Sequence, residues 1–152
     1  MATRIYRIDS RKLMRHLKAA RDSGVRPTTF KVGPYSFTEW VAEGRPAIYV
    51  AYHQPESECY LGRIQRNKLF PQRTFRLRRD LRAIRAFVEN PLQAAAAAAK
   101  TAERPICACC GRPLGTRDVK TGIGEKCMER WQWGTLPRTI LKRQGRRNSR
   151  AT

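Results

Sequence analysis

The cysteines constrain this sequence more than any other feature. Four of the five, Cys107, Cys109, Cys110 and Cys127, fall within one short stretch of the C-terminal third. Disulfide frameworks are rare in reducing compartments, where clustered cysteines are typical of metal sites. The other cysteine, Cys59, lies in a strand-like run, where a buried free thiol is the ordinary interpretation. We therefore expect a small metal-stabilised module near the C-terminal end.

The spacing of these cysteines favours zinc. Cys107 and Cys110 form a C-x-x-C knuckle that Gly111 follows directly. Two thiolates at this spacing converge on one ion, and the glycine relaxes the turn so that backbone amides can point at the sulfurs. Cys127 follows the G-I-G sequence at 122–124 and lies near the start of a helix-compatible stretch at 125–132, where the helix dipole favours a thiolate. These patterns predict Cys107, Cys110 and Cys127 as Zn²⁺ ligands in a treble-clef-like finger.

The fourth zinc ligand stays open. A second C-x-x-C pair would need Cys or His at position 130, which is Arg130. Cys109 lies in the same turn as the knuckle and Asp118 lies in the intervening loop, so both are candidates. His16 and His53 are candidates only if the N-terminal domain brings them next to the cysteines. In its own segment, we expect His16 on the solvated side of a basic helix and His53 as a hydrogen-bonding residue of a turn.

The C-terminal third also resembles a known family. Asn90-Pro91-Leu92, an alanine-rich helix, C-x-C-C-G-R-P-L and G-I-G-x-x-C followed by Trp131 resemble an uncharacterised family of small zinc-finger-like domains in phage and actinobacterial proteins. The resemblance covers residues 90–134 and departs from the family pattern at residues 115–118 and at Glu125. It implies zinc and a phage or mobile-element setting. It implies no activity.

Three helices are expected before the cysteines. The first spans residues 10–23 and ends at Gly24, a residue suited to helix termination. The second begins after Phe75, where apolar residues recur at helical spacing. The third opens at Asn90, with Pro91 at its first helical position. The apolar stripe of the second helix consists of Leu77, Leu81, Ile84 and Val88.

The segment between the first two helices has a strand pattern. Runs at 28–32, 47–53 and 59–65 alternate as strands do, and the last two form a hairpin across a turn-rich sequence. Residues 35–42 fit either a strand or a short helix. We expect Tyr49, Tyr52, Trp131 and Trp133 in the core. The predicted fold class is α+β: a small antiparallel sheet with flanking helices, then a helical connector and a treble-clef-like zinc finger.

Four parts follow from these patterns. A basic α+β domain is expected at residues 1–89, a helical connector at 90–104, a zinc-finger-like module at 105–134 and a basic flexible tail at 135–152. No apolar run is long enough to span a bilayer, and the N-terminal residues lack a signal-peptide pattern. We expect a cytoplasmic protein, in the host cytoplasm if it is phage-encoded, with no membrane partner.

The charge of the chain indicates a polyanionic partner. Lys and Arg number 32 against 12 Asp and Glu, which gives a net charge of +20. Residues 63–85 contain nine Lys and Arg against one acid, interleaved with two phenylalanines, a mixture that suits phosphate contacts with occasional base stacking. We expect DNA or RNA to bind mostly through phosphates, or, as an alternative, a host protein machine that this chain inhibits or modulates. The candidate nucleic-acid contacts are Arg63, Arg66, Lys68, Arg73, Arg76, Arg78, Arg79, Arg82, Arg85, Arg143, Arg146 and Arg147.

The patterns of common metal and phosphate enzymes are missing from the sequence. A zinc deaminase needs H-x-E before its P-C-x-x-C segment, but His53 is followed by Gln54, Pro55 and Glu56. Metal-dependent nucleases need clustered carboxylates or histidines, and only two histidines are present. The glycines at 122 and 124 lack the lysine of a nucleotide-binding loop. We expect a binding protein rather than an enzyme.

Overall fold

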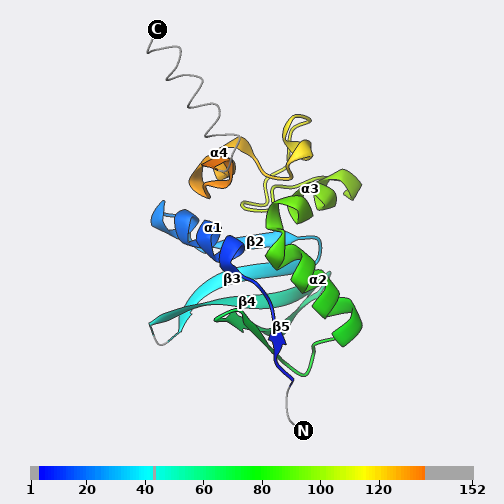
Figure 1. The fold of residues 1–152 in the computed structure, drawn as a ribbon. Coiled ribbons are helices and arrows are strands. Elements are labelled where there is room, and N and C mark those ends of the chain that lie inside the picture. The colour runs from blue at the N-terminus through cyan, green and yellow to red at the C-terminus, as the bar shows by residue number, and fades with distance from the viewer. Residues whose placement is uncertain (1–3, 43, 136–152) are drawn as a thin grey trace.

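The computed structural model describes residues 4–42 and 44–135, arranged as Figure 1 shows. Within these residues the strands form one antiparallel sheet of six strands, in the order β1-β6-β5-β4-β3-β2. The strands are β1 (Tyr6–Arg7), β2 (Thr29–Val32), β3 (Tyr35–Ala42), β4 (Arg45–Gln54), β5 (Ser57–Gln65) and β6 (Lys68–Pro71). The helices are α1 (Arg11–Asp22), α2 (Leu77–Glu89), α3 (Pro91–Thr101) and α4 (Glu125–Arg130), with short 3-10 helices η1 (Asp118–Lys120) and η2 (Trp133–Thr135). The predicted α+β class is therefore confirmed.

The central strands follow the alternation of their side chains. Residues 35–42, for which the sequence pattern fitted either a strand or a short helix, form β3. Tyr35 and Phe37 alternate with small polar residues there, as a pleated strand requires. Strands β4 and β5 form the predicted hairpin. Strands β1 and β6 were not predicted, because runs of two and four residues are too short to show a period.

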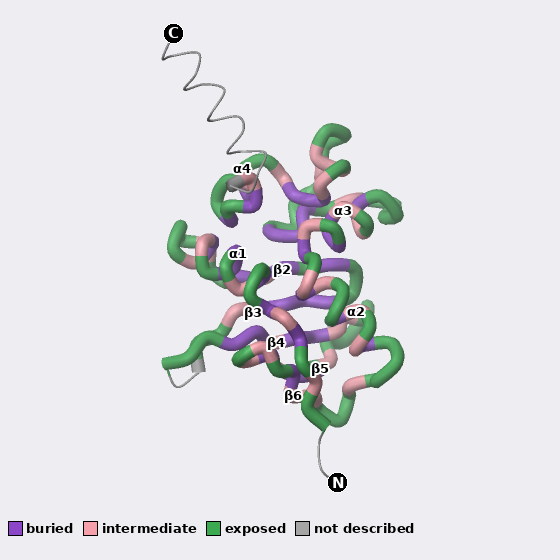
Figure 2. The backbone as a smooth tube through the Cα atoms, viewed as in Figure 1, coloured by how far each residue is buried: buried purple, intermediate pink, exposed green. Residues whose placement is uncertain are grey.

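Helices α1 and α2 lie side by side over one face of the sheet (Figure 1). Figure 2 shows that the buried segments gather between these helices and the strands. Leu17 of α1 and Ile84 and Val88 of α2 are fully buried there. The stripe predicted for α2 is wrong at its first residue, since Leu77 is 48% exposed and the buried position of that turn belongs to Asp80.

Asp80 joins α2 to the sheet through hydrogen bonds. Its carboxylate accepts the Tyr35 hydroxyl at 2.8 Å, the backbone N–H of Arg76 at 2.6 Å and Arg79 Nε at 2.7 Å. Burial acts to raise the pKa of this carboxyl, but the hydrogen bonds from Arg79, Arg76 and Tyr35 together hold the pKa below its usual value. The Arg79 guanidinium also lies 4.1 Å from the centre of the Tyr52 ring. Asp80 therefore stays ionised in the first turn of α2, where the helix dipole favours a negative charge.

A second buried carboxylate joins α1 to the same strand. Arg21 Nη1 of α1 lies 3.0 Å from Oε1 of Glu39 on β3, whose side chain is 3% exposed. Burial raises the pKa of Glu39, and the Arg21 charge opposes that change. Each covering helix is thus tied to β3 by one carboxylate in addition to its apolar packing.

The hydrophobic core continues past the edge of the sheet into the C-terminal module. The N–H of Lys31 on β2 donates to the carbonyl of Ala108 at 2.7 Å. The ring of Phe30 lies 6.4 Å from Trp131 and 5.6 Å from Trp133, measured between centroids. Both tryptophans are buried, as predicted, and they belong to the same core cluster as the residues under α1 and α2.

Replacing Asp80 with Asn should lower the free energy of unfolding by about 2 kcal/mol, because hydrogen bonds to a charged group contribute about 1.5–3 kcal/mol. Urea denaturation at pH 7 measures the change. Asp22→Asn, at the exposed end of α1, is the matched control and should change stability by less than about 0.5 kcal/mol.

The Asp80 effect should also depend on pH in a defined direction. Because the folded-state pKa of Asp80 is lowered, its ionisation stabilises the fold above the unfolded-state pKa of about 3.9, and this contribution is lost as the pH falls through the folded value. The difference between wild type and Asp80→Asn should hold from about pH 7 to about pH 5 and shrink below about pH 4. A difference that is unchanged in acid would show that the charge is not what stabilises α2.

Candidate metal centre and nucleic-acid interface

Three cysteines converge in the C-terminal module. The Sγ atoms of Cys107, Cys110 and Cys127 all lie within 4.8 Å of one another. The first two belong to a turn that a β-bridge between Ile106 and Pro113 closes into a short hairpin. Cys127 lies in the first turn of α4. The knuckle, the hairpin and the ligand-bearing helix have the arrangement predicted for a treble-clef-like finger, and the three sulfurs can hold a metal ion.

Backbone amides stabilise a thiolate at Cys107. Its Sγ accepts the N–H of Cys109 at 3.4 Å and the N–H of Gly124 at 3.3 Å. Gly111 has a φ of 74°, and its N–H closes the turn on the Cys107 carbonyl at 2.9 Å. Hydrogen bonds from the Cys109 and Cys127 thiols and from these amides hold the pKa of Cys107 far below its usual range, and the bond to Cys107 raises the pKa of Cys127 to about 12. These contacts favour the thiolate of Cys107, the form that binds metal.

Cys109 lies against the cluster without belonging to the group of three. It is buried, it contacts the thiols of Cys107 and Cys127, and it accepts a hydrogen bond from Trp133 Nε1 at 3.3 Å. Burial and the two neighbouring thiols raise the pKa of Cys109. A metal ion beside the thiol would lower that pKa again, because a bound cation favours the thiolate.

Within the described residues, the other fourth-ligand candidates are held elsewhere. Asp118 lies in η1, with its carboxylate 3.7 Å from Arg117 Nε. His53 Nε2 lies 2.7 Å from a serine hydroxyl on the neighbouring strand. His16 is buried rather than solvated, which corrects the prediction: it is 3% exposed, and its Nδ1 lies 2.8 Å from the carbonyl oxygen of Trp131. The C-terminal module covers this part of α1, a contact that no local pattern reveals.

The G-I-G sequence packs tightly on α3. Gly122 has a φ of 73°, and a Cβ at this position would lie 2.1 Å from the carbonyl oxygen of Ala95. Its own carbonyl accepts the N–H of Ala108 at 3.0 Å, and Ile123 is fully buried beside it. Both the backbone conformation and the close approach require glycine here. Helix α3, predicted as a connector, is the platform on which the cysteine module rests.

No family model, curated protein or solved structure matches this chain. The class that the fold and the site define is an α+β domain with a cysteine-rich module that can hold a metal ion. The resemblance of residues 90–134 to the phage and actinobacterial family stays a prediction. In the described part of the chain, no helix has the length and the apolar character that crossing a bilayer requires.

The predicted basic contacts lie on both sides of the sheet. By strand register, Arg63 of β5 and Lys68 of β6 belong to the face opposite the helices. Arg76, Arg78, Arg79, Arg82 and Arg85 lie in or directly before α2 on the other side, and Arg66 and Arg73 lie in exposed turns. The tail residues Arg143, Arg146 and Arg147 lie outside the described residues. Of the α2 group, Arg79 already pairs with a buried carboxylate.

The open face of the sheet carries a row of aromatic rings that the sequence analysis missed. Centroids of Trp40 and Tyr49 are 5.7 Å apart, and those of Tyr49 and Tyr60 are 5.6 Å apart. Trp40 is 55% exposed and Tyr60 is 40% exposed. Next to the row, the Arg63 guanidinium lies 4.8 Å from the centre of the Phe70 ring. Tyr49, expected in the core, belongs to this row instead; its place between two buried apolar residues of β4 is the signal that identifies the outward face.

Replacing Cys127 with Ser should remove bound metal and unfold the C-terminal module, because metal binding supplies folding free energy to so small a unit. Elemental analysis after purification under reducing, chelator-free conditions measures the metal, and hydrogen exchange of residues 105–134 measures the unfolding. Cys59→Ser, in β5, is the matched control and should keep full metal. A full complement of metal in Cys127→Ser would show that the ligand set is wrong. Absence of metal from the wild-type protein would refute the metal site itself.

Replacing Gly122 with Ala should separate the cysteine module from α3, because the new methyl group collides with the Ala95 backbone. We expect a loss of about 2 kcal/mol or more of unfolding free energy and weaker metal retention against a chelator. Gly115→Ala is the matched control, since a Cβ there meets no atom within 4 Å. Equal effects of the two substitutions would contradict the docking of the module on α3.

Proposed function

We propose that this protein binds single-stranded nucleic acid on the open face of its sheet. The observation that carries the proposal is the row of Trp40, Tyr49 and Tyr60, with centroids 5.7 and 5.6 Å apart. Exposed aromatic rings on a sheet are stacking platforms for bases, and each stacked base contributes about 1–3 kcal/mol. Because the bases of a duplex already stack on one another, such a row favours a single strand of DNA or RNA.

Positive charge surrounds this row. By register, the described strand residues of the same face include Lys31, Arg45, Arg63 and Lys68 and one acid, Glu58. Cations beside stacking rings suit a phosphate backbone, and phosphate contacts give affinity with little sequence readout. The net charge of +20 adds attraction for any polyanion at longer range.

We further propose that zinc occupies the cysteine cluster as a structural ion. Thiolate ligands select zinc over calcium or magnesium, which prefer oxygen. Cys109 is the best-supported fourth ligand, because its thiol lies against Cys107 and Cys127, whereas Asp118 has no such contact. The elemental analysis described above should then find zinc at about one ion per chain. The similarity of residues 90–134 to phage and actinobacterial domains supports an accessory role in a phage or mobile element.

The contacts of the buried carboxylates and of His53 support a binding function rather than a catalytic one. Two carboxylates that are shielded from solvent, Asp80 and Glu39, each pair with an arginine and hold a helix on β3. Their charges are thereby used for the fold. His53 is likewise engaged with a hydroxyl of the neighbouring strand.

Removing two rings of the row should weaken binding of a fluorescent single-stranded oligonucleotide. We expect the variant Trp40→Ala with Tyr60→Ala to lose at least about tenfold in affinity, uniformly across sequences, since each ring stacks one base. Leu77→Ala is the matched control, because Leu77 is also exposed and apolar but lies on α2. Arg63→Glu should flatten the dependence of affinity on salt more than Arg82→Glu, because each lost phosphate contact removes counterion release.

Two outcomes would contradict this assignment. If Arg82→Glu weakens binding and the ring variant does not, nucleic acid binds on the α2 side. If no oligonucleotide binds even at low salt, the nucleic-acid proposal fails. A partner that stays bound to the tagged protein after nuclease digestion would then support the alternative, a modulator of a host protein machine.

A further inference from the structure

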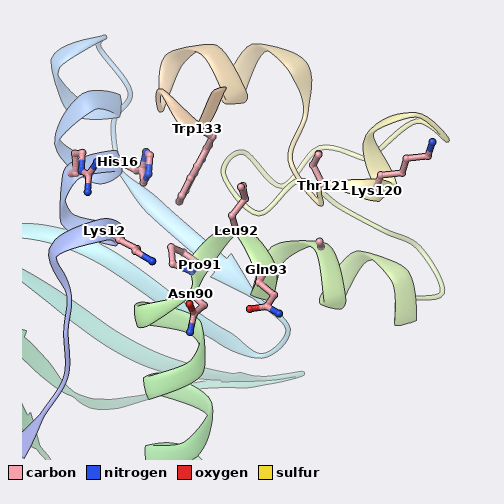
Figure 3. A pocket seen from close by; sticks show the side chains of 11 residues that line it. Lys12, His16, Asn90, Pro91, Leu92, Gln93, Lys120, Thr121 and Trp133 are labelled. Atoms are coloured by element: carbon pink, nitrogen blue, oxygen red, sulfur yellow. The ribbon is translucent and has the colours of Figure 1, made fainter. Parts of the chain in front are cut away.

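A cavity of about 580 Å³ lies where α1, the start of α3 and the C-terminal module meet (Figure 3). Three sequence segments that are far apart in the chain contribute its walls. The lining residues are Lys12, Arg15 and His16 of α1, residues 90–93 and Ala96 at α3, and Lys120, Thr121 and Trp133. Among these described residues none is acidic, so the cavity has a positive lining. Its volume is that of a small-molecule site rather than of a packing defect.

His16 supplies a buried polar group to this cavity. The side chain is 3% exposed and its ring stacks on Trp133 at a centroid distance of 3.7 Å. Nδ1 lies 2.8 Å from the Trp131 carbonyl, so Nδ1 carries the proton, and Nε2 is the ring nitrogen without a partner among the described residues. In this tautomer Nε2 is an acceptor; it is not one of the fully enclosed side-chain atoms that lack a partner in the described part of the chain, so it can accept a hydrogen bond from a group in the cavity that His16 lines.

The N-terminus of α3 forms another part of the wall. The helix has 11 residues, Asn90 precedes it without capping through its side chain, and Pro91 is its first residue. The N–H groups of Leu92 and Gln93 come too early in the helix to have intrahelical partners. Free amides at a helix N-terminus, with the positive end of the dipole, bind anions and phosphates in particular.

Cationic side chains of α1 reinforce this polarity. Lys12, Arg15 and His16 are spaced by three and four residues, so they share one face of the helix. In Figure 3, Lys12 extends toward Asn90 and Pro91, whereas Lys120 extends away from the other labelled side chains. Lys12 therefore supplies charge that faces the uncapped helix end, and Arg15 is a further cation of the cavity lining.

We infer that this cavity binds a phosphate monoester carried on a group of nucleotide size. The phosphate lies between Lys12, Arg15 and the first amides of α3, and a hydroxyl of the ligand donates to Nε2 of His16. The ligand is either a free nucleotide or the terminal nucleotide of a strand. This inference is independent of the sheet-face proposal, because α1 and α3 are not on the open face.

Titration calorimetry of the full chain with AMP, adenosine and inorganic phosphate at low salt tests the cavity. AMP should bind at least about tenfold more tightly than adenosine, since a charge-assisted hydrogen bond contributes about 1.5–3 kcal/mol. Lys12→Glu should weaken AMP binding by at least about tenfold, and so should His16→Gln. Lys18→Glu is the matched control, because it makes the same charge change on α1 outside the cavity.

The source of the phosphate is distinguished with oligonucleotides that carry a 5′-phosphate or a 5′-hydroxyl. A preference for the phosphorylated end that Lys12→Glu removes assigns the cavity to a strand terminus, and tight AMP binding without that preference assigns it to a free nucleotide. Lys12 is exposed, so its variant folds even if the His16 variant does not. The inference is overturned if neither AMP nor phosphate binds the wild type, or if Lys12→Glu and Lys18→Glu weaken AMP equally. Trp40→Ala should leave AMP binding intact, which separates this site from the sheet face.

Discussion

The packing of two C-terminal tryptophans against the β2 edge is the contact on which the rest of the structure depends. Trp133 covers both His16 and Phe30, and Trp131 holds the histidine through its carbonyl. β2 is an edge strand, and the same C-terminal module pairs with it through the Lys31 N–H and the Ala108 carbonyl, whereas unpaired edges are liable to pair with other chains. The same segment also positions Cys127 and closes the cavity beside α1. The cysteine cluster, the sheet edge and the cationic cavity are therefore parts of one folded unit.

The acidic residues of this chain also matter for its charge balance. With a net charge of +20, the positive side chains repel one another when the chain becomes compact. The fold places most of its arginines and lysines outward, on both sides of the sheet, where solvent and salt screen them. Asp80 and Glu39 are placed inward, and each pairs with an arginine of a covering helix. A small number of buried carboxylates thus holds two strongly basic helices on one strand.

Local patterns of the sequence were enough to predict most elements and the convergence of Cys107, Cys110 and Cys127. Helix periodicity, the turn at the β4–β5 hairpin and the C-x-x-C spacing act over a few residues, so they are visible without a structure. The burial of His16, the role of Asp80 and the row of Trp40, Tyr49 and Tyr60 were not visible, because each depends on which elements become neighbours. His16 was expected in solvent for the same reason that α3 was expected to be a simple connector: the module that covers both is remote in the chain.

This separation along the chain determines the order in which the packing partners appear during synthesis. His16 and the carbonyl it contacts are separated by 115 residues, so α1 and the whole sheet leave the ribosome before their last packing partners exist. Until then the nascent domain has an open β2 edge and an incomplete core, the kind of intermediate that invites misassembly. Cys127 and the tryptophans emerge together, so the third cysteine of the cluster and the last core residues become available in the same step. Under the zinc proposal, the supply of the ion at that step would govern how long the incomplete form persists.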